Sequence, residues 1–201
     1  MHYLKLKRVI DFTLSLGGLI VLSPIFLILI VCIKIDSKGP ILFKQKRVGI
    51  HKSHFNILKF RTMSIDTPRD TPTHLLENPD QWITKVGMFL RKTSLDELPQ
   101  IINILKGEMS IIGPRPALWN QYDLIEERDK YKANDIPPGL TGLAQIKGRD
   151  ELPIEVKAKL DGEYTENISL LLDIKCFLGT IISVLKSKGV VEGAQEGEEH
   201  I

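Results

Sequence analysis

Residues 12–33 read FTLSLGGLIVLSPIFLILIVCI, a run of 22 residues without a charged side chain. As an α-helix with a rise of about 1.5 Å per residue, this run is long enough to cross a bilayer. It is too long for the apolar core of a typical cleaved signal peptide, and the segment Lys34–Lys38 follows it where a small-residue cleavage site would stand. We therefore expect a membrane segment that the protein keeps.

Two residues at the centre of this run, Ser23 and Pro24, predict a break in the helix. Pro24 lacks a backbone donor and clashes with the preceding turn, and Ser23 can satisfy the backbone groups that are freed. Both flanks are basic, whereas the positive-inside rule gives a spanning helix one basic side. This pattern favours a re-entrant helix-break-helix with both ends in the cytoplasm, and a kinked spanning helix is the alternative. The flanking basic residues are Lys5, Lys7, Arg8, Lys34, Lys38, Lys44, Lys46 and Arg47.

The charge of the chain is unevenly distributed. Residues 1–61 hold eleven Lys or Arg and two acids, a net charge of +9, and the remaining 140 residues hold sixteen Lys or Arg and twenty-three acids, a net charge of −7. The N-terminal third is thus expected to meet an anionic partner such as membrane lipid. With 43% hydrophobic residues the chain is not disordered as a whole, and two cysteines exclude a disulfide framework and a zinc ribbon.

The remaining pattern predicts a mostly helical α+β fold in three parts. These are a membrane helix-break-helix over 1–38, a catalytic domain over 39–188 and an acidic, mobile tail over 189–201. Extended segments are expected at 41–43, 54–60 and 143–146, loops at 69–79 and 136–142, and helices at 84–90, 94–109, 118–133, 154–164 and 170–185. The helices at 94–109 and 170–185 are amphipathic, and their apolar faces suit either the protein core or the membrane interface.

Chemistry is expected at residues 94–100, SLDELPQ, where Asp96 and Glu97 are adjacent. Ser94 and Glu97 also have the spacing of a helix capping box, so capping and catalysis stand as equal interpretations of this stretch. The phosphate-binding loop G-x-x-x-x-G-K-[ST], the dinucleotide motif G-x-G-x-x-G and the hydrolase motif G-x-S-x-G are all absent from the sequence.

The surrounding cations favour catalysis. Arginines held in turns shaped by proline or glycine suit bidentate binding of phosphate, and two carboxylates can hold Mg²⁺ on a pyrophosphate. A carboxylate is also ionised at neutral pH without a general base and can itself act as a nucleophile. The candidate phosphate-binding residues are Lys59, Arg61, Arg91, Arg115 and Arg149.

Taken together, these motifs resemble the bacterial sugar transferases, the small monotopic phosphoglycosyl transferases that start polyprenyl-linked glycan assembly. The similarity covers nearly all of residues 5–185. Chain length and the expected re-entrant helix resemble the branch that serves campylobacter-type N-glycosylation. The matching stretches are KRVID (7–11), GPILF (39–43), RVG (47–49), KFRTM (59–63), TSLDELPQ (93–100), GEMS (107–110), GPRP (113–116), PGLTG (138–142) and GR (148–149).

The resemblance implies that a UDP-sugar and undecaprenyl phosphate give undecaprenyl diphosphate-sugar and UMP. Asp96 would be the nucleophile that holds the phosphosugar, and Glu97 would handle a metal ion or a proton. Arg115 would contact a phosphate and Arg149 the nucleotide. Asp161 and Asp173 match an acidic pattern of the family and join the expected substrate-binding residues, with surface charge as the equal alternative.

The expected cofactor is Mg²⁺, and the expected sugar is an N-acetylated amino sugar. Expected partners are the UDP-sugar, undecaprenyl phosphate, anionic membrane lipid and downstream glycosyltransferases, with no nucleic acid. The expected location is the cytoplasmic face of the bacterial inner membrane. Two other functions stay open from the sequence: a non-catalytic membrane scaffold that binds lipid phosphate, and a lipid pyrophosphatase.

Overall fold

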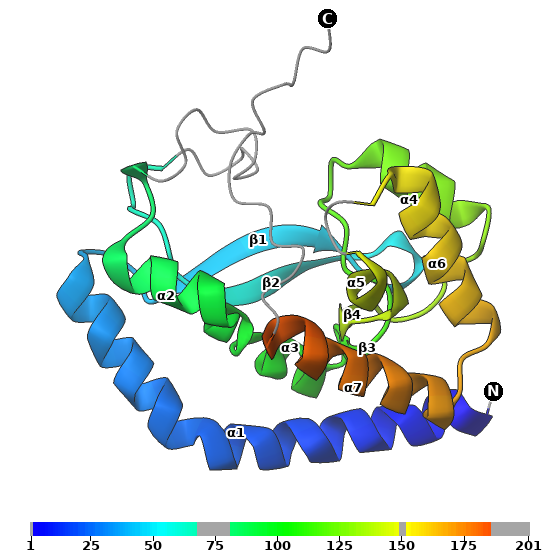
Figure 1. Cartoon of the computed structure of the whole chain (residues 1–201), viewed down its shortest axis with the longest axis horizontal. Helices are drawn as coiled ribbons and strands as arrows, with labels where there is room; N and C mark the ends of the chain where they lie inside the picture. Colours follow the sequence, from blue (N-terminus) through cyan, green and yellow to red (C-terminus); the bar gives the residue numbers. More distant parts are fainter. Residues whose placement is uncertain (1, 68–80, 149–151, 186–201) are drawn as a thin grey trace, which may run out of the picture.

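A computed structural model describes residues 2–67, 81–148 and 152–185. Three expected features lie outside these residues: the loop at 69–79, Arg149 and the acidic tail at 189–201. Helices α1 (His2–Asp36), α3 (Gln100–Lys106) and α7 (Leu170–Leu185) form the lower part of the molecule in Figure 1, and two small sheets lie above them. The mostly helical α+β class predicted from the sequence is confirmed.

Helix α1 is one continuous helix, where the sequence predicts two helices separated by a break. Figure 1 shows that it bends sharply, so that its first arm runs beneath the domain and its second arm rises beside α2 (Lys85–Thr93). Pro24 lies inside the helix, and the Ser23 hydroxyl donates to the carbonyl oxygen of Ile20 at 2.7 Å. Proline therefore kinks the helix without ending it, which is the usual outcome when neighbouring groups satisfy the freed backbone.

The first sheet is an antiparallel hairpin of β1 (Leu42–Val48) and β2 (His54–Phe60), joined by the short 3-10 turn η1 (Ile50–Lys52). Its register pairs Phe43 with Lys59. Ile57 on β2 packs with Ile104 of α3 and with Met109 in one of the buried clusters. The predicted extended segments at 41–43 and 54–60 are thus confirmed, and the first of them is longer than expected.

The second sheet is a short parallel pair, β3 (Ser110–Ile112) and β4 (Gly139–Thr141). Gly113 and Gly139 allow the two segments to approach closely, because a Cβ atom on either would overlap backbone atoms of the other segment. Neither strand is predicted from the sequence, which assigns 110–112 no element and 139–141 to a loop. The expected strand at 143–146 is wrong, since Leu143–Lys147 forms helix α5.

Helices α4 (Tyr122–Asp129) and α6 (Ile154–Glu166) lie together at the right of Figure 1. Helix α4 is shorter than the predicted 118–133, whereas α6 and α7 follow their predictions closely. A buried ion pair joins α4 to α6, because Arg128 Nη2 on α4 lies 2.6 Å from Asp161 Oδ2 on α6.

Candidate active site

Asp96 and Glu97 lie in η4 (Leu95–Glu97), a single 3-10 turn between α2 and α3. The predicted helix at 94–109 is thus divided. Ser94 adopts a left-handed backbone conformation (φ 57°) that ends α2, and Pro99 stands at the start of α3. The capping-box interpretation is wrong, because the Ser94 side chain forms no cap hydrogen bond. The acidic pair therefore lies on a short turn, whose backbone is held at both ends by a helix.

Apolar neighbours hold this acidic pair against the long apolar helix α1. Leu95 and Leu98 flank the two acids in sequence and pack against the buried cluster that contains Leu29 and Ile33 of α1. Phe60 belongs to the same cluster and directly follows Lys59, and its ring centroid lies 5.4 Å from that of Phe26 on α1. Both polar parts of the site are thus attached to the second arm of α1 by the residues next to them.

Glu97 is held by two cations. Lys59 Nζ lies 2.7 Å from Glu97 Oε1, and Arg115 Nη2 lies 2.8 Å from the same oxygen. Burial acts to raise the pKa of Glu97, but the charges and hydrogen bonds of Arg115 and Lys59 outweigh it and hold this pKa well below its usual range. Glu97 is therefore a fixed negative charge that orients the two cations.

Asp96 is in a different environment. It is buried, and its Oδ2 lies 3.8 Å from Lys59 Nζ, beyond hydrogen-bond distance. Burial raises the pKa of Asp96 and the charge of Glu97 adds to this, while Lys59, Arg91 and Arg115 act against it. A carboxylate that is desolvated, yet kept close to cations, is a good nucleophile for a phosphorus atom whose oxygens those cations attract.

Two other predicted cations, Arg91 and Arg61, form hydrogen bonds with different parts of the structure. Arg91, in the last turn of α2, donates from Nε to Thr62 Oγ1 at 3.0 Å, and its charge reaches Asp96. Arg61 is engaged away from the acidic pair. It is buried and donates to the carbonyl oxygens of Ser37 and Lys38, so it fixes the loop after α1 and not the acidic pair.

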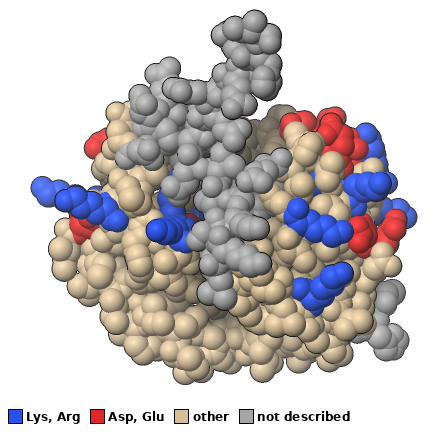
Figure 2. Space-filling model, in the orientation of Figure 1, with Lys and Arg blue, Asp and Glu red and all other residues tan. Residues whose placement is uncertain are grey.

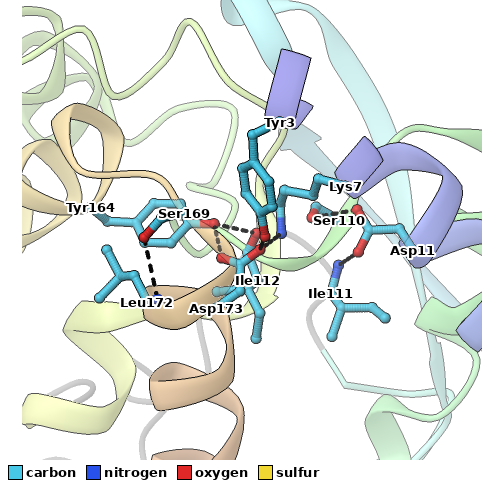
Figure 3. A network of polar contacts seen from close by, with 10 residues as sticks. All are labelled: Tyr3, Lys7, Asp11, Ser110, Ile111, Ile112, Tyr164, Ser169, Leu172 and Asp173. Atoms are coloured by element: carbon cyan, nitrogen blue, oxygen red, sulfur yellow. Dashed lines mark hydrogen bonds and ion pairs between the residues drawn. The ribbon is translucent and has the colours of Figure 1, made fainter. Parts of the chain in front are cut away.

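The two later acids are also engaged elsewhere. Asp161 is buried against Arg128, and Asp173 accepts hydrogen bonds from Tyr3, Lys7 and Tyr164. The network around Asp173 ties the first arm of α1 to α7, as Figure 3 shows. Neither carboxylate is an exposed surface charge, and neither contacts Asp96 or Glu97. Nothing in the sequence signals the partner of Asp161, because Arg128 lies 33 residues away in a charge-rich helix.

The acidic pair also fits the predicted Mg²⁺, with the substrate as a further source of ligands. Within 2–67, 81–148 and 152–185, no group of three or more His, Cys, Asp or Glu side chains forms a metal cluster. Mg²⁺ is commonly held by one or two carboxylates together with substrate phosphates and water. Asp96 and Glu97 can supply such oxygens, although Oε1 of Glu97 already pairs with both Lys59 and Arg115.

Comparison with known proteins shows the family of the chain. The family model described as "Bacterial sugar transferase" matches residues 2–187, nearly the whole chain. The chain belongs to the bacterial sugar transferase family. The transferase is 41% identical to sugar transferase EpsL of Bacillus subtilis over 186 residues, which cover 92% of this chain and 90% of that relative. It is 37% identical to exopolysaccharide production protein ExoY of Sinorhizobium fredii, with coverage of 91% and 87%.

A longer relative carries the activity in its name. The transferase is 38% identical to the UDP-glucose:undecaprenyl-phosphate glucose-1-phosphate transferase of Escherichia coli over 191 residues, which are 91% of this chain and 41% of that protein. The sequence-based prediction of a phosphoglycosyl transferase is thus confirmed as an enzyme class.

Proposed function

We propose that the transferase moves a sugar phosphate from a UDP-sugar to undecaprenyl phosphate, releasing UMP. The observation that carries this proposal is the buried Asp96 next to Glu97, which pairs with Lys59 and Arg115, on a turn that packs directly against a long apolar helix. A water-soluble nucleotide and a lipid phosphate can meet at such a place with little loss of freedom, because the lipid phosphate is already confined to the interface.

In the first step an Asp96 carboxylate oxygen attacks the β-phosphorus of the UDP-sugar. A bond forms between this oxygen and phosphorus, the bond from phosphorus to the bridging oxygen breaks, and UMP leaves with the electron pair. In the second step an oxygen of undecaprenyl phosphate attacks the same phosphorus and the bond to Asp96 breaks. The product is undecaprenyl diphosphate-sugar, and the Asp96 carboxylate is restored.

Lys59 and Arg115 stabilise the charge that develops on the phosphate oxygens in both steps. They are already oriented by Glu97, so no reorganisation is needed when the charge appears. Mg²⁺ held by the two carboxylates would neutralise pyrophosphate charge when bound. Arg115 is suited to contact a phosphate of the UDP-sugar because 40% of its side chain is exposed while its guanidinium pairs with Glu97.

We also propose that α1 is re-entrant and that the domain lies on the cytoplasmic face of the membrane. Both ends of α1 contact the same domain: Tyr3 donates to Asp173 of α7, and Asp36 accepts from the backbone N–H of Val86 in α2. A helix of this length and composition can cross a membrane. Crossing would place its two ends on opposite sides of a hydrocarbon core about 30 Å thick, where one domain could not contact both. Contacts at both ends, together with the kink, support a helix that enters and returns.

The lipid-facing surface of this arrangement is broad. Outward residues of α1 such as Ile20, Val21 and Leu27 are exposed, and so is the apolar face of α7, where Leu171 is 79% exposed. Figure 2 shows no charged atoms along the lower edge of the molecule, which α1 forms. We therefore propose that α7 is an interfacial helix, whereas α3 packs against α1 as part of the protein interior.

Cysteine labelling from one side of sealed vesicles tests the topology. We expect a single cysteine, inserted directly after Met1 or substituted at Lys38 in a Cys32→Ser/Cys176→Ala background, to react with an impermeant reagent from the same side in both cases, because both ends of α1 stay with the domain. Labelling from opposite sides would show a spanning helix. A straightened control, Pro24→Ala, should loosen the contacts at one end of α1 and lower the stability of the protein in detergent.

An assay of UMP release tests the reaction. With undecaprenyl phosphate and a panel of UDP-sugars, including UDP-glucose and N-acetylated amino sugars, we expect multiple turnovers of UMP with at least one donor. We propose an N-acetylated amino sugar as this donor, for use in glycoconjugate assembly. A pure scaffold would release no UMP, and a lipid pyrophosphatase would release phosphate with water as acceptor, so either result would refute the proposal.

A further inference from the structure

Helix α2 presents an apolar pair to the outside, next to the acidic pair. Met88 and Phe89 are 54% and 56% exposed, although both are large apolar side chains. Lys85 and Lys92 lie one turn away on either side, so all four share one face at spacings of i, i+3, i+4 and i+7. We call these four residues the α2 stripe. The opposite face is buried through Gly87 and Leu90.

The orientation of the α2 stripe is fixed by the packing of the helix. Gly87 lies against the backbone of Thr62 so closely that a Cβ atom there would overlap it. Arg91 donates to the Thr62 hydroxyl, and Thr84 accepts from the N–H of Gly87 at the start of the helix. Helix α2 therefore cannot roll to bury Met88 and Phe89, and their exposure calls for a partner from outside the domain.

Helix α2, which carries the α2 stripe, lies between the second arm of α1 and the acidic pair. Helix α2 packs against the second arm of α1, whose outward residues Ile28, Val31 and Ile35 are exposed in the same way. At its other end, Lys92 stands four residues before Asp96.

We propose that the α2 stripe is the recognition surface for the acceptor lipid, and this rests on the proposed function. Met88 and Phe89 contact the isoprene units next to the phosphate of the acceptor, and Lys92 attracts that phosphate on its way to the Asp96 adduct. A thioether and an aromatic face suit the branched, unsaturated isoprenoid chain. The lysine at the end nearest the acidic pair matches the negative head group in charge.

The test compares two double variants in vesicles of fixed phospholipid composition that contain undecaprenyl phosphate. Met88→Ser/Phe89→Ser removes the apolar pair of the α2 stripe. The matched control, Phe177→Ser/Leu178→Ser, removes a similar pair that is 51% and 53% exposed on α7, away from the acidic pair. The first readout is the KM for undecaprenyl phosphate, measured with equal amounts of vesicle-bound enzyme. The second is the burst of UMP that the first step gives without acceptor.

For the α2 variant we expect a KM increase of about tenfold or more, the loss that follows when two partly buried apolar contacts are removed. Its UMP burst should match the wild type, which also shows that the variant is folded. The α7 control should bind vesicles more weakly but keep the acceptor KM within about twofold once binding is normalised. Equal acceptor KM values for both variants would overturn the proposal and leave α2 as a membrane anchor only.

A second measurement separates recognition from anchoring. The wild type should prefer undecaprenyl phosphate over an unbranched alkyl phosphate, and the α2 variant should lose most of this preference. An unchanged preference would contradict the proposal, since anchoring alone does not distinguish the two chains. Failure of the proposed reaction looks different, because the wild type would then give no UMP burst at all.

Discussion

Asp96→Asn should abolish turnover, lowering UMP release by about 10³-fold or more, because the substitution removes the nucleophile itself. The amide is nearly the same size as the carboxyl group, so the turn η4 and its contacts with α1 should persist. The covalent phosphosugar adduct should also disappear when the UDP-sugar is supplied without acceptor. Both can be measured by UMP release and by mass spectrometry of the intact protein.

The matched control for this prediction is Glu126→Gln, the same carboxyl-to-amide change at an exposed position of α4. It should leave UMP release and adduct formation unaffected. If Asp96→Asn kept near-native turnover, or if the adduct were found on another side chain, Asp96 would not be the nucleophile. Glu97→Gln should instead weaken the hold on Lys59 and Arg115 while the site of attachment remains Asp96.

Lys7→Met should strongly destabilise the protein without touching the acidic pair. Lys7 is buried, and its Nζ lies 2.6 Å from Asp173 Oδ2, so the substitution leaves a buried carboxylate without its counter-ion. Breaking such a pair typically costs about 3–5 kcal/mol. For a chain of this size, a loss of that order lowers the Tm by roughly 6–20 °C, which thermal unfolding in detergent can detect.

Two further variants make this prediction specific. Lys5→Met removes an exposed lysine two residues away and should change the Tm little. The double variant Lys7→Met/Asp173→Leu removes both charges and should recover much of the stability lost by the single variant. A Tm for Lys7→Met close to the wild-type value would mean that Tyr3 and Tyr164 alone satisfy the Asp173 carboxylate.

Much of the fold follows from patterns of short range. The apolar run predicts α1, and its central proline predicts where α1 departs from a straight helix, although as a break and not as the observed kink. The helical spacing of Leu171, Ile174, Leu178 and Ile182 predicts α7. Strands β3 and β4 could not be found in this way. Each has three residues, and they pair because Gly113 and Gly139 allow close backbone contact between segments that are distant in sequence.

The candidate site was predicted only in its centre. The structure brings together four of the predicted residues: Lys59, Asp96, Glu97 and Arg115. Each lies in a turn or near a strand end, where a charged side chain can reach residues of other segments. Arg61 has the same local signature, yet it is used by the loop after α1. Whether an arginine meets substrate or backbone depends on the tertiary structure, and the charge pattern does not contain that information.

The attachment of strand β2 and the acidic turn η4 to α1 has a practical consequence for protein production. Deleting residues 1–36 would uncover Phe60, Leu90, Leu95 and Leu98 together, and would strip Asp173 of two of its donors. A water-soluble enzyme therefore cannot be obtained by simple truncation. It would require redesign of the outward side chains of α1 and α7 while the inward half of each helix is left intact.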